Sequence, residues 1–450
     1  MEVFFFILGI LLLLALCWRF NLASFYLLIF LAPFLGLVVD FSQYTFAQKI
    51  PGLADIQAPV ADILAIIIFL SLILKTWVKS QRPNLFLPWI NTFKETGLEF
   101  FLPFLVIGIV SLFNLEKEQL GGSFKYFLRP IVFFYLMWIV LPHFIITTKA
   151  ILQKTIITLF SAGLIAASWG WLSTILKSGG DLWKRITPGS LGGLAPLTFN
   201  HNILAEVLVM AIPLAFYLFI RSQQNTNKTK EKLLFLSFIF LTLTTLLTFS
   251  RAAWLALLFE LIIYLFIQNK KASAGATETR QQFWWKKMGV LFILLLPVII
   301  YMAAFSFSSI VKSSTTTRLD MTGIAWTYFS AHPLIGNGVG TFTQLVGDTR
   351  LFTVEYGDPL DSHGVIQKLI AETGLLGLIT FFIFVGWVTT QLYTSAKNST
   401  EGKTLTTLIL VSFLGCLVFQ LFNTSYYNQH LWLIVGIGLA AKKVLPSNYL

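Results

Sequence analysis

Long apolar stretches separated by short polar segments occupy most of this sequence. A helix that crosses a bilayer needs roughly 20 apolar residues, and the pattern predicts about 12 or 13 such transmembrane helices. We expect these spans at about residues 3–17, 22–39, 58–74, 98–114, 126–146, 155–176, 203–220, 233–249, 252–268, 289–307, 374–395, 405–422 and 430–441. The chain is therefore predicted to be an all-α polytopic membrane protein.

The distribution of Lys and Arg indicates which loops face the cytoplasm, because cytoplasmic loops retain these residues. The loops 221–232 and 269–287 are strongly basic and are separated by two spans, so both are expected inside. Alternating from these loops places the C-terminus inside and, if the first two apolar runs are separate spans, the N-terminus outside. The outer side then receives the loop 177–202, the turn at Ser250 and Arg251, the connector 424–429 and a large segment.

The large outer segment covers residues 308–373 and has mixed polarity with short apolar runs. Helical spacing predicts helices at 319–329 and 362–371 within it. Four parts of the chain follow from this pattern. They are the N-terminal transmembrane helices (1–202), the central helices with the Arg251 turn (203–307), the large outer loop (308–373) and the C-terminal helices (374–450).

Composition supports a membrane protein and excludes several classes. The chain is 56% hydrophobic and 12% charged, whereas soluble domains carry about 25% charged residues. Its net charge of +12 is spread over short loops, so no nucleic-acid partner is expected. The two cysteines, Cys17 and Cys416, lie in apolar runs, and no metal-binding or nucleotide-binding motif is present. The sequence therefore predicts no metal and no cofactor.

Two arginines on the predicted outer side stand against the positive-inside trend. Arg251 lies between the apolar runs 233–249 and 252–267, where a charge at membrane depth costs about 2.5–3.5 kcal/mol. Arg318 follows the polar run 313–317. An interface anchor and a solvated loop cation are the plain alternatives. Together, the two planar guanidinium groups are suited to bind a diphosphate, because each can hold phosphate oxygens bidentately.

Further candidates accompany these arginines. His363 heads a predicted amphipathic helix, and histidine is the usual general base near neutral pH; a plain surface histidine is the alternative. Glu206 lies within a predicted span, one turn from Asn202, and is expected to face an outer cavity. Arg129, beside Pro130, either faces the same cavity or packs at an interface.

Three sequence blocks in order resemble the O-antigen ligase and polymerase superfamily. The segment 248–254 is similar to its S-R-x-x-W block, and the segment 318–340 is similar to an arginine followed by an aromatic helix and a glycine-rich turn. The segment 362–377 is similar to its histidine block and contains Glu372 as a supporting residue. The segment 199–205 is similar to a weaker asparagine block. The family often has asparagine after the histidine, where this chain has Gly364.

The resemblance implies a metal-independent, inverting glycosyltransferase with a GT-C-like fold and no cofactor. Its donor would be a glycan on a polyprenyl diphosphate, typically undecaprenyl, at the outer face of a bacterial inner membrane. Arg251 and Arg318 would bind the diphosphate, and His363 would deprotonate the acceptor hydroxyl. The acceptor is open between lipid A–core, a growing polysaccharide and a protein hydroxyl, so ligase, polymerase and protein O-oligosaccharyltransferase activities all fit. A transporter or flippase for an anionic lipid is the alternative from another class.

Overall fold

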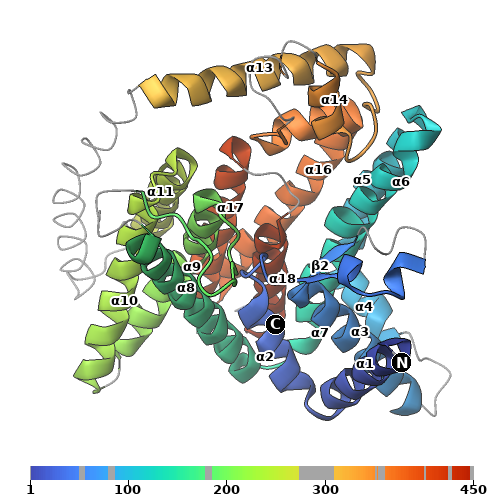
Figure 1. Ribbon diagram of the computed structural model, residues 1–450. Coiled ribbons are helices and arrows are strands. Elements are labelled where there is room, and N and C mark those ends of the chain that lie inside the picture. Colours follow the sequence, from blue (N-terminus) through green and yellow to red (C-terminus); the bar gives the residue numbers. More distant parts are fainter. Residues whose placement is uncertain are drawn as a thin grey trace.

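The computed structural model describes residues 2–49, 56–79, 87–177, 185–224, 226–272, 309–349, 352, 360–399, 402–423 and 428–445. These residues are mostly helical (Figure 1). The α-helices are α1 (Glu2–Arg19), α2 (Asn21–Leu31), α3 (Val60–Lys79), α4 (Leu87–Glu95), α5 (Leu98–Ser111), α6 (Lys117–Phe127), α7 (Leu141–Ile145), α8 (Lys149–Lys177), α9 (His201–Ser222), α10 (Lys228–Leu247), α11 (Arg251–Ala272), α13 (Ser309–Ala331), α14 (Phe342–Asp348), α16 (Val365–Asn398), α17 (Lys403–Phe422) and α18 (Gln429–Val444).

Short elements connect the helices. Three 3-10 turns, η1 (Phe41–Gln43), η2 (Ala47–Lys49) and η3 (Leu112–Asn114), and two π-helical stretches, η4 (Leu128–Phe133) and η5 (Tyr135–Val140), are present among the described residues. Strands β1 (Val38–Asp40) and β2 (Gln57–Pro59) pair antiparallel, with Val38 opposite Pro59. The prediction of an all-α polytopic membrane protein is confirmed, with this two-stranded ribbon as a minor addition.

Six described helical segments are individually long and apolar enough to cross a membrane, or up to eight spans if two bent pairs each count as one. The six are Val60–Val78, Lys117–Ile145, Lys149–Leu176, His201–Ser222, Val365–Asn398 and Lys403–Phe422. This number is smaller than the 12 or 13 expected from the apolar runs. The predicted span 289–307 lies outside the described residues, and α18 has only 16 residues.

The N-terminal apolar runs do not form two separate straight spans. α1 and α2 meet at an angle of 111°, and α2 ends at Leu31 although the apolar run continues to residue 39. Pro33 and Gly36 follow this end, and a proline disfavours helical backbone at the residue before it. The chain therefore turns and enters β1, so the predicted span 22–39 is wrong in its second half.

The centre of the helix bundle is formed by α9, α17 and α18. Every residue from Leu204 to Ala215 in α9 is buried, and so is every residue from Gln429 to Ala441 in α18. Outer helices such as α1, α3 and α8 instead expose large apolar side chains, including Leu12 and Leu176. Apolar exposure of this kind is what a lipid-facing helix requires, whereas a soluble bundle would present polar groups there.

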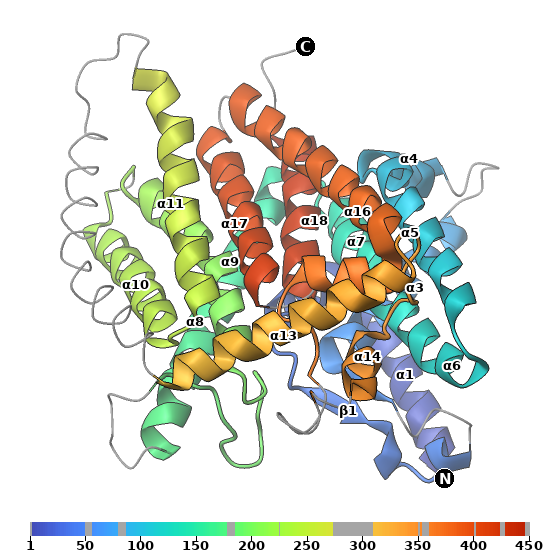
Figure 2. The ribbon, with the colours of Figure 1, turned by 90° about the horizontal axis from the view of Figure 1, so that it is seen from above.

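The predicted outer loop folds at one end of the bundle. In Figure 2, α13, α14, β1 and the start of α1 lie toward the same end, while α4 and the last turns of α11 and α16 lie toward the other. α13 reaches from above α11 to α14 and the first part of α16 (Figure 1). The buried side chains of Met321, Phe342 and Val346 form a small separate core between these helices, with Ala371 of α16.

The predicted loop helix 362–371 and the predicted span 374–395 are one element with a sharp bend. α16 runs from Val365 to Asn398 and is interrupted only at Gly374, where φ is 64° and ψ is −164°. This left-handed backbone suits glycine because no Cβ is present to clash. The bend joins the short helical segment that follows His363 to the long apolar part of α16.

The glycine-rich turn 336–340 docks against this bend. The amide of Asn337 donates to the Ala371 carbonyl at 2.9 Å, and the amide of Gly338 donates to the Glu372 carbonyl at 2.9 Å. Beyond the bend, the amide of Leu375 donates to the Pro333 carbonyl at 2.9 Å. The loop and α16 are therefore held together through the backbone, which fixes α13 and α14 over the bundle.

Candidate active site

Arg251 begins α11 after a tight turn that follows α10. Phe249 adopts a left-handed backbone with φ 53°, a conformation that costs a non-glycine residue roughly 1–2 kcal/mol. Trp254 closes the turn twice, because its backbone amide donates to the Ser250 carbonyl and its Nε1 donates to the Leu246 carbonyl, each at 3.1 Å. The S-R-x-x-W block thus builds a rigid support that presents Arg251 at a helix N-terminus.

Arg318 approaches the same place from α13. Gln367 of α16 holds this part of α13, since its Nε2 donates to Thr322 Oγ1 at 2.5 Å and to the Arg318 carbonyl at 3.5 Å. Burial, together with the positive charge of Arg251, lowers the pKa of Arg318 from its usual value. Arg318 Nε is buried and has no hydrogen-bond partner among the described residues. The two arginines predicted to act together are therefore neighbours.

His363 precedes α16 and lies within electrostatic range of Arg318. Burial is the main factor that lowers the pKa of His363, and the Arg318 charge lowers it further. A backbone hydrogen bond with Asn423, at the end of α17, and the nearby Asp361 carboxylate partly oppose this change by raising the pKa. The ring is thus held against α17 and is kept in its neutral, proton-accepting form at pH values where an ordinary histidine begins to protonate.

Gly364, where the resembled family often has asparagine, is the N-cap position of α16. A Cβ atom at residue 364 would lie 2.6 Å from the Leu421 carbonyl oxygen. The end of α17 therefore approaches the backbone so closely that no side chain fits without movement. This contact brings α17 against the loop that carries His363. It also explains why residue 364 is glycine in this chain.

The start of α9 adds two groups that the sequence interpretation did not assign to the site. Arg185 Nη1 lies 2.9 Å from His201 Nε2, and His201 lies within electrostatic range of both Arg185 and Arg318. Burial lowers the pKa of the Arg185 guanidinium. The only available signal for Arg185 was its membership of the small group of outer-side basic residues.

Three helix N-termini thus gather around three arginines. They belong to α9, α11 and α16, and Arg318 of α13 lies within electrostatic range of His201, Arg251 and His363 at their starts. An N-terminus favours a nearby anion by roughly 0.3–1 kcal/mol. Buried polar atoms without a hydrogen-bond partner among the described residues, Ser250 Oγ and Ser362 Oγ, occur in two of these helix starts. The arrangement is suited to bind a ligand with several negative charges beside a neutral histidine.

The predicted supporting residues Glu206 and Asn202 have different environments. Glu206 is fully buried, and its carboxylate accepts from Gln420 Nε2 at 2.9 Å and from Asn428 Nδ2 at 2.8 Å. It therefore ties α9 to α17 and to the start of α18 and does not face an open cavity. Asn202 is in the first turn of α9, where its amide donates to the Asn200 side chain at 2.9 Å.

Arg129 and Glu372, the other supporting candidates, also have structural partners. Arg129 Nε donates to Asp62 Oδ2 at 2.7 Å, and its guanidinium lies 5.2 Å from the centre of the Phe134 ring. This favours the packed alternative for Arg129. Glu372 is fully buried, and its Oε1 accepts the Phe342 amide of α14 at 3.1 Å.

No group of three or more His, Cys, Asp and Glu side chains that could hold a metal ion is found in the described part of the chain.

The fold and this site define a multi-pass membrane protein with a cationic site beside a histidine at one end of its bundle. Residues 236–382 match the family model described as O-antigen ligase. The matched region contains Arg251, Arg318 and His363, and the match supports the resemblance to the O-antigen ligase and polymerase superfamily. Comparison with curated proteins gave no match. The family match supports glycosyl transfer of the O-antigen ligase type in broad terms, with lipid-linked glycans as substrates in general.

Proposed function

We propose that this protein transfers a glycan from a polyprenyl diphosphate carrier to an acceptor hydroxyl at the outer face of a bacterial inner membrane. The observation that carries this proposal is the grouping of Arg251, at the N-terminus of α11, and Arg318, within α13, beside the partly buried His363. A lipid-linked diphosphate is anionic and membrane-bound, so it matches a cationic site at the end of a membrane bundle. Undecaprenyl diphosphate is the carrier that the family resemblance favours.

The reaction assigns one task to each group. The acceptor oxygen attacks the anomeric carbon, and its proton passes to the neutral ring of His363. The bond between the anomeric carbon and the diphosphate oxygen breaks, and its electron pair remains on the leaving diphosphate. Arg251 and Arg318 stabilise the negative charge that develops there. A single displacement of this kind inverts the anomeric configuration and needs no metal ion.

The surroundings of His363 support its role as the base. Its lowered pKa keeps the ring neutral, and its hydrogen bond with the Asn423 backbone orients the ring. Such an arrangement leaves the ring able to accept a proton from a hydroxyl placed on its open side. Acceptance of that proton makes the His363 ring a cation, and the nearby Asp361 carboxylate favours this charged form.

The acceptor remains a choice between lipid A–core, a growing polysaccharide and a protein hydroxyl. All three present a hydroxyl group from the outer side, where α13 and α14 lie over the bundle in Figure 1. We favour a glycan acceptor, of the ligase or polymerase type, on the basis of the family match at residues 236–382. Such an activity belongs to cell-envelope polysaccharide or lipopolysaccharide biosynthesis.

The test is a transfer assay in proteoliposomes with an undecaprenyl-diphosphate-linked glycan and each class of acceptor. Arg251→Ala, Arg318→Ala and His363→Ala are each expected to lower transfer by at least about 100-fold, as loss of a transition-state contact does. Arg221→Ala is the matched control because Arg221 is an exposed arginine at the opposite end of α9. Full activity of the three variants, or movement of intact donor across the membrane without glycosidic bond cleavage, would overturn the proposal.

A further inference from the structure

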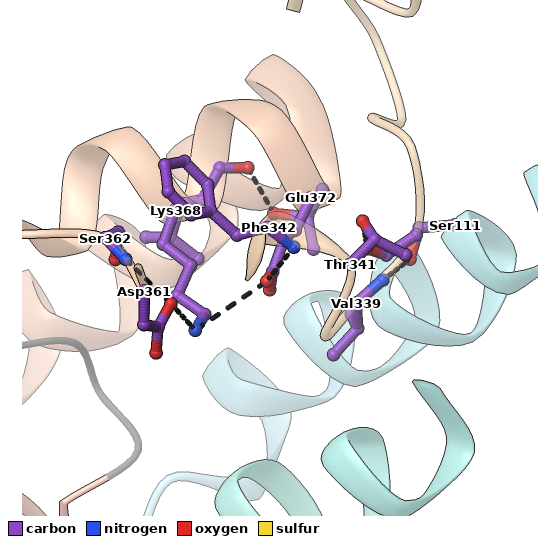
Figure 3. A network of polar contacts seen from close by, with 11 residues as sticks. Ser111, Val339, Thr341, Phe342, Asp361, Ser362, Lys368 and Glu372 are labelled. Atoms are coloured by element: carbon purple, nitrogen blue, oxygen red, sulfur yellow. Dashed lines mark hydrogen bonds and ion pairs between the residues drawn. The ribbon is translucent and has the colours of Figure 1, made fainter. Parts of the chain in front are cut away.

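A buried lysine in the first turns of α16 contacts the loop that carries His363. Lys368 is only 2% exposed, although a solvated position would be ordinary for a lysine on a short amphipathic helix. Its Nζ pairs with Asp361 Oδ1 at 2.5 Å and lies 3.8 Å from Glu372 Oε1. The ammonium group also lies 5.9 Å from the centre of the Tyr126 ring. Figure 3 shows Lys368 between the two carboxylates.

Asp361 is the partner that connects this lysine to the site. The same Asp361 Oδ1 that receives Lys368 also accepts the backbone amide of Ser362 at 2.7 Å. Ser362 directly precedes His363, so the lysine holds the chain two residues before the histidine. A buried charge is costly unless it is paired, and removal of either partner would therefore release this short loop.

The network has a second branch with a structural task. Glu372 Oε1 accepts the Phe342 amide at the start of α14, and Ser111 Oγ accepts the Val339 amide from the glycine-rich turn (Figure 3). This branch holds α14 and the turn in place. The Lys368–Asp361 branch is different, because it ends at the histidine loop and brings a negative charge within range of the histidine ring.

We propose that Lys368 is a positioning residue for glycosyl transfer, because its pair with Asp361 fixes the loop of His363 and balances the charge beside that ring. This inference rests on the proposed function, which takes His363 as the general base. Lys368 itself touches neither the proposed diphosphate site nor the reacting hydroxyl in this assignment. Its effect on transfer passes through Asp361.

The charge balance makes the inference testable by pH. Three groups act on His363 directly: Arg318 of α13, the Asn423 backbone of α17 and Asp361 of its own loop. Others act through these neighbours. Arg251 and His201 lie near Arg318, and Lys368, with Glu372, lies near Asp361. Asp361 raises the pKa of His363, and Lys368 offsets that carboxylate. Loss of the lysine and loss of the carboxylate should therefore move the histidine in opposite directions.

The experiment measures kcat and KM for the lipid-linked donor against pH in proteoliposomes. In Lys368→Met, the acidic limb of the kcat profile should move to higher pH, because the Asp361 charge is no longer balanced. In Asp361→Asn, the limb should move to lower pH. Each shift should be roughly 0.5–1 unit, below that of a directly contacting charge. Each variant should also lose about tenfold in kcat through the released loop, with donor KM within about twofold of the parent because both arginines remain.

Matched variants separate positioning from stability. Lys368→Arg should restore most of kcat and the parental pH profile, because it keeps the charge. Glu372→Gln keeps an acceptor for the Phe342 amide. It should shift the acidic limb of the kcat profile less than Lys368→Met or Asp361→Asn does. Lys228→Met removes a lysine from an exposed ion pair with Glu231 and should change nothing. Asp361 is 45% exposed, so Asp361→Asn keeps the test decisive if Lys368→Met does not fold.

The inference is supported if the acidic limbs of Lys368→Met and Asp361→Asn move in opposite directions. It is overturned if kcat falls while both limbs stay in place, because Lys368 then only stabilises the fold. Full activity of His363→Ala would overturn the proposed base and, with it, this inference. Inactive His363→Ala together with unmoved limbs would overturn the inference alone.

Discussion

Gly336 is the position at which a single methyl group should test the docking of the outer loop most directly. Its φ is 71°, and a Cβ there would lie 2.4 Å from the Glu372 carbonyl carbon and 2.4 Å from the Thr373 amide nitrogen. Both contacts are with backbone atoms of α16 near its bend, so no flexible side chain can yield. Gly336→Ala should therefore push the turn away from α16.

The size of the effect follows from two contributions. An alanine in left-handed backbone costs about 1–2 kcal/mol, and forcing an extra methyl group into a packed contact costs about 1–3 kcal/mol more. The docked state of α13 and α14 should thus lose roughly 2–5 kcal/mol, which raises the undocked population at least about 30-fold. Because α13 carries Arg318, the rate of glycosyl transfer should decrease as the docked population decreases.

Two measurements on detergent-purified protein check this prediction. Limited proteolysis of the outer loop reports undocking, and thermal unfolding reports the loss of stability. Gly323→Ala is the matched control, since Gly323 lies within α13 with nothing within 4 Å of its Cβ position and should gain roughly 0.5–1 kcal/mol of helix stability. Proteolysis and unfolding of Gly336→Ala that match the parent protein would refute the docking argument.

Three further predictions concern the site itself. Arg318→Gln removes a positive charge near His363, so the pKa of His363 should rise toward its usual value; the acidic limb of the residual transfer activity should then move to higher pH, and a limb that moves to lower pH would contradict the assignment. Gly364→Ala places a methyl group 2.6 Å from the Leu421 carbonyl oxygen and should lower kcat on the order of tenfold or more by displacing the histidine, with an unchanged circular dichroism spectrum; unchanged kcat would show that α17 yields easily. Arg185→Ala should raise the KM for the lipid-linked donor by roughly threefold to tenfold, with little change in kcat, because a partly exposed charge contributes modestly; steady-state kinetics with unchanged KM would remove Arg185 from the site.

The two arginines of the candidate site stand out in the sequence because their positions conflict with a general rule. Arg251 interrupts two apolar runs, and Arg318 falls in a segment predicted to lie on the side where cations are depleted. Their closeness could not be predicted from spacing, since they are 67 positions apart and meet only after α13 folds over the bundle. The helix boundary at Gly374 was likewise predicted from the start of the apolar run 374–395, whereas the continuity of α16 across it depends on tertiary contacts.

Other residues could not be assigned because their meaning depends on burial. A lysine on an amphipathic helix normally reaches solvent, so nothing in the sequence distinguishes Lys368 as a buried group. Arg185 lies in a Gly- and Pro-rich loop, where a solvated arginine is equally consistent with the pattern. The apolar run 22–39 has the composition of a membrane helix, and only the backbone restriction before Pro33 ends it early.

The two arginines of the anion site belong to parts of the chain that are joined differently to the bundle. Arg251 begins α11 of the helix bundle. Arg318 lies on α13, which is held on the bundle by backbone contacts between the glycine-rich turn and α16. Burial lowers the pKa of Arg318, and the positive charge of Arg251 lowers it further. Docking of α13 therefore has an electrostatic cost that an anion between the two arginines would reduce. If the proposed function holds, a bound diphosphate contacts both arginines and so stabilises the docked position of α13. Linkage then requires that a change which stabilises the docked α13 also strengthens binding of the lipid carrier, and that release of the carrier weakens the docking of α13.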